Sequence, residues 1–248
     1  MVGNDSYLQL LGGILWAVCM TRPDAAYHAA HLCQFMGNPS PKAWDAALGV
    51  LTYLYHSREL GITYGGPHKT CIEPTADTEN GLIGMSDTSY GKAAYPFAGG
   101  IVMWRNGAVA WFSRKVRYVP DSTCFGELGA LNTVLKEAMF ASNLLNERYA
   151  SLVAVPHLVT PNGNTQYDDM GVPHLVCDGK SAIDVIKNPG VTKRSAHYET
   201  WLYFARDAYL TNKAKFFHTT TDKMMADNLT KVVDRTKFFA CRNYQMNI

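Results

Sequence analysis

The sequence predicts an α/β fold in which a mixed five-stranded sheet with flanking helices follows an N-terminal helical segment. Apolar residues recur at helical spacing from residue 6 to residue 58. From residue 82 onward, short apolar runs of the kind found in buried strands alternate with longer stripes at helical spacing. A hydrophobic content of 47% over 248 residues is enough for a sizeable core, in one large or two small domains.

Residues 6–58 are predicted to form three helices. The tripeptide Thr21-Arg22-Pro23 separates the first helix from the second, since proline favours a first helical turn. The second helix ends at Gly37, because glycine is common just after a helix C-terminus. Ser40 is predicted to cap the third helix, whose apolar stripe is Trp44, Ala47, Leu48, Leu51, Leu54 and Tyr55.

A boundary follows these helices. Residues 59–81 contain several glycines and prolines and a polar run at 73–80, a composition typical of a connection. We therefore predict a helical domain over residues 1–66, a linker over 67–80 and a second domain over 81–248.

Five strands are predicted in the second domain. The turn Arg105-Asn106-Gly107 lies between two apolar runs, and Asn-Gly in this setting is a strong hairpin signal. Pro173 precedes the fourth strand and Asp178 stops it. The predicted strands are Leu82–Ser86, Phe97–Trp104, Val109–Arg114, Leu175–Cys177 and Ala214–His218.

Helices are predicted between and after the later strands. The longest covers residues 125–146, and its apolar stripe includes Leu128, Leu131 and Leu135. Shorter helices are predicted around Ala182–Ile186, ending at Asn188, over residues 196–211, and over residues 223–231. Residues 147–172 form a long connection, of a kind that is often functional or mobile.

Four acidic residues lie at strand ends or in helices: Asp87, Glu127, Asp178 and Asp227. Asp87 and Asp178 each follow a strand directly, and open α/β sheets bind ligands at that edge. Asp178 could equally cap the helix that follows it, as aspartate often does. Glu127 lies on the side of its helix that faces the sheet, where a carboxylate needs a partner or a cation. Alternatively it lies near solvent, where it favours the helix macrodipole.

Charge and composition narrow the class of protein only slightly. A net charge of +2 neither requires nor excludes a nucleic-acid partner, because a near-neutral chain can carry a local basic patch. Arg114, Lys115 and Arg117 form such a cluster, either as a solvated edge or as phosphate contacts. Six scattered cysteines without a CxxC pair are typical of a reduced intracellular protein. The apolar run Leu10–Met20 is shorter than the roughly 20 residues that cross a bilayer, so no membrane span is predicted.

Six segments form a specific series along the chain. The helical segment carries Thr-Arg-Pro-Asp at Thr21–Asp24. It is followed by LIGMSDTSYG, AVAWFSRKVRYV, GELGALNTVLKEA, VCDGKSAIDVIKNP and MMADNLTK. In this order, the segments resemble the C-terminal part of a copia-type retrotransposon polyprotein, which comprises the tail of the reverse transcriptase followed by the RNase H domain. Each motif is weak alone, but the ordered combination is specific and covers nearly the whole chain. The resemblance implies that the sheet is RNase H-like.

The resemblance also implies a function, that of a Mg²⁺-dependent endoribonuclease that cleaves the RNA strand of RNA–DNA hybrids. Its catalytic, metal-binding carboxylates would be Asp87, Glu127, Asp178 and Asp227. Two Mg²⁺ ions, with Mn²⁺ as a substitute, would hold the attacking and leaving oxygens of an in-line displacement. Asp87 would bridge the two ions, Glu127 and Asp178 would hold one of them, and Asp227 would hold the other.

Substrate contacts follow from the same resemblance. Such a protein recognises the shape of the hybrid and the 2′-hydroxyls of its RNA strand. Hydroxyl groups beside a strand end are also ordinary features of loops. His197 matches a histidine of a Lys-His motif in the family and has either a substrate-side or a structural role. The candidate contacts are Ser86, Thr88, Ser89, Ser181, His197, Arg114 and Lys115.

The chain departs from the family pattern in ways that leave an alternative open. The second acidic residue of the first RNase H motif is absent from SDTSYG, and only Glu127 remains of the family's Thr-Glu-Ala-Glu-Tyr. No Tyr-x-Asp-Asp motif is present, so DNA synthesis by this chain alone is not expected. The alternative is a transposon-derived, catalytically idle RNase H-like structural subunit of a larger host assembly.

The two alternatives imply different partners. The nuclease would bind an RNA–DNA hybrid and the rest of a reverse transcriptase, whereas the idle subunit would bind other subunits of its host complex. The expected location is intracellular, in the cytoplasm or a virus-like particle, or in an organelle for a domesticated protein.

Overall fold

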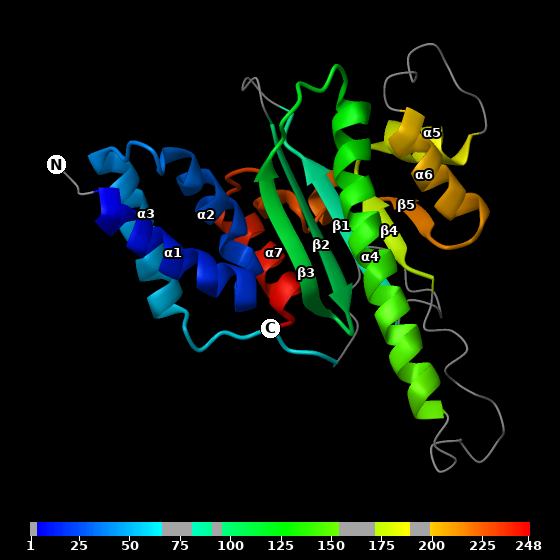
Figure 1. Cartoon of the computed structure of the whole chain (residues 1–248), viewed down its shortest axis with the longest axis horizontal. Helices are drawn as coiled ribbons and strands as arrows, with labels where there is room; N and C mark the ends of the chain where they lie inside the picture. The colour runs from blue at the N-terminus through cyan, green and yellow to red at the C-terminus, as the bar shows by residue number, and fades with distance from the viewer. Residues whose placement is uncertain (1–3, 66–80, 91–95, 154–171, 189–198) are drawn as a thin grey trace.

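The structure is a computed structural model that describes residues 4–65, 81–90, 96–153, 172–188 and 199–248. Its elements form three layers with a five-stranded sheet in the middle (Figure 1). The N-terminal helices and the last helix, α7, cover one face of the sheet, while α4 and the shorter α5 and α6 cover the other. The predicted linker over 67–80 lies outside the described residues, so the division into two domains stays a prediction. Within the described ranges, no helix is both long and apolar enough to cross a membrane.

The sheet is mixed and five-stranded, as predicted, with the strand order β3-β2-β1-β4-β5. The pairs β1–β2 and β2–β3 are antiparallel, whereas β1–β4 and β4–β5 are parallel. The predicted hairpin is confirmed, because Arg105 and Asn106 both have positive φ values (48° and 67°), as a tight two-residue hairpin turn requires. The strands are β1 (Leu82–Thr88), β2 (Phe97–Trp104), β3 (Gly107–Lys115), β4 (His174–Cys177) and β5 (Lys215–His218).

The helices agree with the prediction over most of the chain. The predicted cap of the third helix is confirmed, because the Ser40 side chain accepts a hydrogen bond from the Ala43 amide at 3.2 Å. The longest helix extends further than predicted at both ends. The α-helices are α1 (Asn4–Thr21), α2 (Ala26–Leu32), α3 (Pro41–His56), α4 (Thr123–Val153), α5 (Lys180–Lys187), α6 (Glu199–Leu210) and α7 (Arg235–Met246). Short 3-10 turns, η1 (Pro23–Ala25) and η2 (Cys33–Phe35), flank α2.

The C-terminal part differs from the prediction in two respects. The helix predicted over 223–231 is wrong: this stretch forms two 3-10 turns, η6 (Thr221–Lys223) and η7 (Asp227–Leu229), separated by the extended backbone of Met224. Side chains just after η7 turn towards β1 instead of continuing a helix. The helix α7 was not predicted, although Asp234 caps it by accepting a hydrogen bond from the Lys237 amide at 3.0 Å.

The N-terminal helices pack on the sheet. Buried side chains of α1, including Tyr7, Leu11 and Ile14, share one hydrophobic core with Met85 and Ile101 of the sheet. The indole of Trp111 on β3 also donates a hydrogen bond to the Val18 carbonyl at 3.0 Å. The helical segment therefore supports the same face of the sheet that η7 and α7 cover.

The Thr-Arg-Pro-Asp motif fastens these helices to one another. Arg22 and Asp24 form a buried ion pair at 2.8 Å between Nη2 and Oδ2, and Arg22 also donates to Ser57 beyond the end of α3. Tyr53 of α3 donates a hydrogen bond to the same Asp24 carboxylate. Because a buried ion pair is costly to break by removing one partner, this motif has a structural role here.

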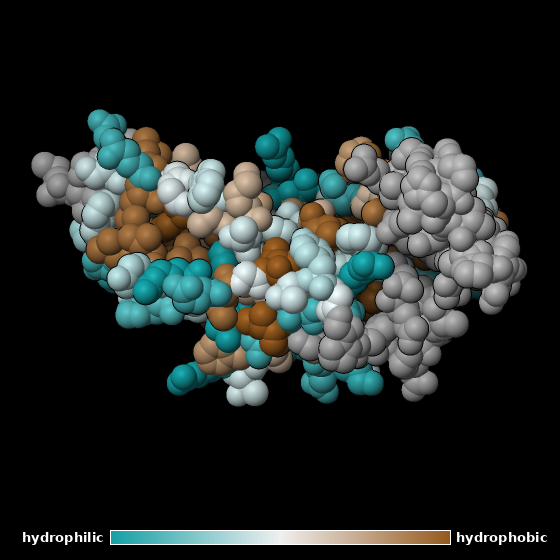
Figure 2. Space-filling view, turned by 90° about the horizontal axis from the view of Figure 1, so that it is seen from below, coloured by the Kyte–Doolittle hydropathy of each residue, from teal (hydrophilic) through white to brown (hydrophobic). Residues whose placement is uncertain are grey.

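The outer side of the helical segment remains apolar. Figure 2 shows hydrophobic surface over the N-terminal helices, and Trp16 and Tyr55 are 70% and 61% exposed. The segment thus buries one side on the sheet and presents the other to its surroundings.

Candidate active site

The carboxyl ends of β1 and β4 form the base of the candidate site. These strands are parallel neighbours, and Ser86 pairs with Cys177 in their register. Asp87 and Asp178 are the next residues on each strand, so they lie side by side at one edge, with neighbouring strands about 4.8 Å apart. Asp178 does not cap α5, since the N-cap residue of that helix is Gly179. Its carboxylate instead accepts a hydrogen bond from Thr221 at 3.1 Å.

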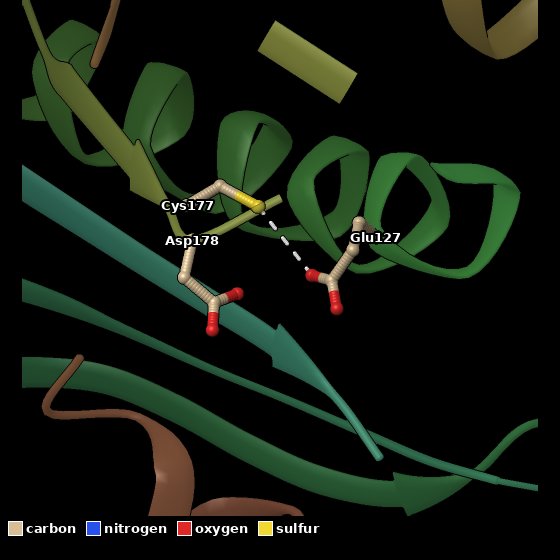
Figure 3. A group of neighbouring side chains, drawn as sticks. All are labelled: Glu127, Cys177 and Asp178. Atoms are coloured by element: carbon tan, nitrogen blue, oxygen red, sulfur yellow. Dashed lines mark hydrogen bonds between the residues drawn. The ribbon is translucent and has the colours of Figure 1, made fainter. Parts of the chain in front are cut away.

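Glu127 reaches this edge from the first turns of α4. It is only 8% exposed, and the Cys177 thiol donates a hydrogen bond to its Oε2 at 3.4 Å (Figure 3). The turn after Asp178 comes so close that a Cβ on Gly179 would lie 2.9 Å from the Glu127 Cγ, and only glycine fits there. Glu127, Cys177 and Asp178 each offer one potential metal-ligand atom, and these three atoms lie within 4.8 Å of one another. Such a grouping could hold a metal ion.

The segment from Asp227 to Lys231 approaches Asp87 from the other side of the sheet. It lies against β2 at Gly99, where a Cβ would be 2.6 Å from the Leu229 Cβ. The Thr230 hydroxyl donates a hydrogen bond to Asp87 Oδ2. Lys231 Nζ lies 3.4 Å from Asp87 Oδ2 and 2.8 Å from Asp227 Oδ1, so it bridges the two carboxylates.

A second lysine, Lys237, also lies beside Asp227. Lys237 of α7 places its Nζ 3.4 Å from Asp227 Oδ2 and donates hydrogen bonds to the carbonyls of Thr221 and Asp222. Asp227 therefore has a lysine at each of its oxygens while it is only 3% exposed. The charge of Asp227 is balanced from within the chain.

The electrostatics of the site are dominated by burial. Burial raises the pKa of Asp87 from 3.8 to about 6, with Lys231 and Thr230 opposing the shift. Burial, followed by the charges of Asp87 and Asp178, raises the pKa of Glu127 well above its ordinary value. The pKa of the Cys177 thiol is also raised well above its ordinary value by burial and by Glu127, so the thiol stays protonated and donates. Burial alone would lower the pKa of Lys231, but Asp87 and Asp227 raise it to about 12.

The structure thus brings all four predicted carboxylates to one region, in two halves. Glu127 and Asp178 form one half, and Asp87 and Asp227, bridged by Lys231, form the other. Sequence reasoning missed Thr230, Lys231 and Lys237. Lys231 stands four residues after Asp227, a spacing that predicts contact on a helix. Lys237 could not be placed because α7 was not predicted.

The predicted substrate contacts fall into different environments. Thr88 donates a hydrogen bond to the Gly126 carbonyl at 3.0 Å, and Ser89 accepts one from the Phe97 amide at 2.9 Å, so both hold local backbone. The Ser86 hydroxyl is buried and has no hydrogen-bond partner among the described residues. Ser181 is exposed in the first turn of α5. His197 lies outside the described residues.

Arg114 and Lys115 lie at the same end of the sheet as the carboxylates. Arg114 pairs with Ala98, which pairs with Thr88, so Arg114 is two strands, or about 10 Å, away from β1. Its guanidinium donates a hydrogen bond to Thr133 of α4 at 2.8 Å. Both residues line a groove between β3 and α4, to which Arg117, Lys136 and Trp201 also contribute. The Lys115 ammonium, however, donates a hydrogen bond to Gln34 of η2 at 3.0 Å, so the basic side chains that gather in the groove beside the acidic edge are Arg114, Arg117 and Lys136.

Comparison with known proteins places the sequence among transposon polyproteins. No protein-family model matches the chain. It is 26% identical over 236 residues to the Retrovirus-related Pol polyprotein from transposon TNT 1-94 of Nicotiana tabacum, covering 95% of this chain and 16% of that polyprotein. It is also 31% identical over 140 residues to the Secreted RxLR effector protein 161 of Plasmopara viticola, covering 55% of this chain and 92% of that protein. The chain spans about one sixth of the length of the Pol polyprotein.

Among solved structures, the chain is similar to the LC11 RNase H1 isolated from compost. That similarity covers 61% of this chain and 93% of the other, at 14% sequence identity and a TM-score of 0.43. The same RNase H1 has been solved in complex with an RNA/DNA hybrid. The order and pairing of the strands, with a helix after the third strand, confirm the predicted RNase H-like fold class.

Relatives of the Pol type thus match both the helical segment and the sheet. Matches to Pol polyproteins from transposons of Arabidopsis thaliana extend over 91% of the chain at 24% identity. The homologues of this chain are therefore copia-type retrotransposon Pol polyproteins, to which it is similar over both the RNase H-like sheet and the helical segment that precedes it.

Proposed function

We propose that this RNase H-like domain is a divalent-metal-dependent endoribonuclease that cleaves the RNA strand of RNA–DNA hybrids. The observation that carries the proposal is the convergence of Asp87, Glu127 and Asp178 at the carboxyl edge of two parallel strands. The similar RNase H1 that was solved with an RNA/DNA hybrid and the Pol polyprotein relatives support the same substrate class. The remainder of such a polyprotein is the proposed partner.

The donor atoms fit a hard divalent cation. Glu127 and Asp178 offer carboxylate oxygens, and Asp87 lies next to Asp178 at the same edge. Mg²⁺ and Mn²⁺ prefer such oxygen ligands, and they keep several waters, so few protein ligands suffice. The Cys177 thiol is protonated and bonded to Glu127, so it orients that carboxylate and leaves the ligand set to oxygen atoms. When bound, such an ion supplies an activated water and neutralises charge on the phosphate.

The side chains have distinct proposed roles. Glu127 and Asp178 hold the ion, and Asp87 holds it from the central strand. Asp227 acts through Lys231, with which it forms an ion pair at 2.8 Å. Holding three acidic groups together without a cation is unfavourable, because buried like charges raise one another's pKa values, as they do for Glu127. The site is therefore arranged to be completed by a cation.

The basic groove is the proposed contact for the nucleic-acid backbone. Arg114, Arg117 and Lys136 would neutralise phosphates, which position a duplex without reading its sequence, whereas Lys115 would first have to leave Gln34. Trp201 offers an aromatic surface in the same groove. Because the groove lies beside the acidic edge, a backbone held there can reach the carboxylates.

Cleavage of a labelled RNA–DNA hybrid in Mg²⁺, and separately in Mn²⁺, tests this proposal. We expect wild-type protein to cut the RNA strand, and we expect Asp87→Asn and Asp178→Asn to abolish cutting while folding normally by circular dichroism. A single-stranded RNA and a DNA duplex serve as control substrates. If well-folded wild type cuts nothing in either metal, the nuclease is excluded and the idle structural subunit becomes the better description.

A further inference from the structure

The ammonium group of Lys231 occupies the space between two of the carboxylates. Its Nζ is 2.8 Å from Asp227 Oδ1 and 3.4 Å from Asp87 Oδ2. Both aspartates are almost completely buried, at 3% and 2% exposure, whereas the lysine side chain is 40% exposed. The aliphatic part of the Lys231 side chain therefore runs inward from the surface and places the ammonium group between the two buried aspartates.

This position is held by several contacts. The hydroxyl of Thr230, the preceding residue, donates a hydrogen bond to Asp87 and also lies 3.0 Å from the Asp227 carbonyl oxygen. The close approach of the segment to β2 is possible because Gly99 has no side chain. Lys237 pairs with the remaining oxygen of Asp227 at 3.4 Å. The backbone around Lys231 is thus fixed against the sheet, and the ammonium is aimed at Asp87.

The other half of the cluster lacks such a cation. In the part of the chain that the structure describes, no lysine or arginine forms an ion pair with Glu127 or Asp178. The neighbour that Glu127 does have, the Cys177 thiol, is a neutral donor. The unbalanced negative charge is therefore concentrated on the side of Glu127 and Asp178.

We infer that Lys231 fills one of the two cation positions of the cluster, so that the centre takes a single divalent ion, held by Glu127, Asp178 and Asp87. This inference rests on the proposed function and makes its metal requirement specific. A divalent ion between Asp87 and Asp227 would have to displace the ammonium, since two cations repel strongly at ion-pair distance. The resulting centre differs from the two-ion centre that the family resemblance implies.

Counting bound Mn²⁺ tests the inference without any substrate. Free Mn²⁺ is measured by its solution EPR signal while the full chain is titrated, and the bound number follows by difference. We expect one bound Mn²⁺ per wild-type chain and two per chain of Lys231→Met, a twofold increase. Lys231→Gln provides a second neutral variant, should the methionine variant fold poorly by circular dichroism.

Two control variants make the result specific. Lys231→Arg keeps the positive charge and is expected to bind one Mn²⁺, as the wild type does. Lys223→Met removes an exposed lysine from the preceding turn η6 and should also leave the number at one. A wild type that binds two ions, or neutral variants that remain at one, would overturn the inference.

The outcomes also separate the inference from the proposed function. Wild type that binds one Mn²⁺ but cuts no hybrid would contradict the nuclease and leave the role of Lys231 intact. Wild type that binds two and cuts would contradict only the role of Lys231. A chain that binds no Mn²⁺ would contradict both.

Discussion

The two halves of the acidic cluster contain the same kinds of side chain in different electrostatic settings. Asp87 and Asp227 are bridged by Lys231, and Asp227 has Lys237 as well. Among the residues that the structure describes, no lysine or arginine pairs with Glu127 or Asp178, whose side-chain hydrogen-bond donors are the neutral Cys177 thiol and Thr221 hydroxyl. One half is therefore neutralised by the fold itself, whereas the other half would, in the proposed function, take its cation from solution.

The difference shows that four carboxylates in a family pattern do not by themselves specify a metal stoichiometry. A carboxylate that already has a lysine at each oxygen offers little to a hydrated Mg²⁺ ion, because the ion would have to replace both ion pairs. The number of ions depends on which carboxylates remain unbalanced.

Asp178→Asn and Asp227→Asn should affect cleavage unequally. We expect Asp178→Asn to lower the rate of hybrid cleavage by at least about 100-fold, since it removes a direct ligand of the ion. Asp227→Asn should lower the rate by only about tenfold, the smaller loss seen when a partner outside the ligand set is removed. Initial rates at saturating Mg²⁺ give the comparison. Equal losses in the two variants, with equal loss of Mn²⁺ binding, would mean that the halves are equivalent.

The stability of the metal-free protein should decrease as the pH rises from about 4 to about 6. Because the folded-state pKa of Asp87, about 6, lies above its ordinary value of 3.8, the folded protein binds this proton more tightly than the unfolded chain. A shift of about two units corresponds to a decrease of about 3 kcal/mol in the free energy of unfolding. Glu127 contributes in the same direction.

Urea unfolding at several pH values in EDTA measures this dependence. Asp87→Asn should show a flatter curve than the wild type, because it lacks the titrating group. Added Mn²⁺ should raise stability most above pH 6, where Asp87 is ionised. A wild-type curve that rises over this interval would contradict the assignment of buried, poorly compensated acids.

Lys231→Met should destabilise the metal-free protein and respond strongly to metal. The substitution leaves Asp87 without its cation. We expect the free energy of unfolding to fall by about 1–2 kcal/mol, a value between those for breaking exposed and buried ion pairs. Thermal unfolding in EDTA and in millimolar Mn²⁺ gives the measurement. Mn²⁺ should raise the unfolding temperature of the variant more than that of the wild type. An equal increase in the two proteins would argue that Lys231 does not occupy a cation position.

Cys177→Ala should have the smallest effect. The thiol orients Glu127 without being a ligand, and an S–H group is a weak donor. We therefore expect cleavage in Mg²⁺ to fall by less than about tenfold, below the usual loss for groups that orient a ligand. The small cavity in a fully buried position should cost about 1 kcal/mol of stability. Cys177→Ser, which keeps a donor, is the matched control. A loss in the alanine variant as large as that of Asp178→Asn would make the sulfur a ligand.

The sequence predicted those features that depend on local pattern. The strand Phe97–Trp104 and the hairpin at Asn106 followed from apolar runs and a turn dipeptide, and both are observed. Asp87 and Asp178 were placed at one sheet edge because each directly follows an apolar strand, and the parallel register confirms this. Ser40 was predicted as a cap from residue type and the following proline, and it is one.

The features that were missed depend on contacts between distant segments. Asp227 was assigned to a helix, whereas tertiary contacts of Thr230 and Lys231 with Asp87 hold that stretch in a 3-10 turn. The helix α7 has its apolar residues interrupted by charged ones, so its pattern is weak, and Lys237 was missed with it. Lys231 bridges Asp87 and Asp227, which are about 140 positions apart in the sequence. This contact could not be predicted from sequence spacing, because it exists only where the fold brings the two carboxylates together.

The most direct test is the anomalous scattering of Mn²⁺ in crystals of the wild-type chain with a hybrid whose RNA strand carries 2′-O-methyl groups to prevent cleavage. We predict one strong Mn²⁺ peak among Glu127, Asp178 and Asp87, with Lys231 Nζ still between Asp87 and Asp227. A second peak between Asp87 and Asp227, with the lysine displaced towards solvent, would contradict the asymmetry of the two halves.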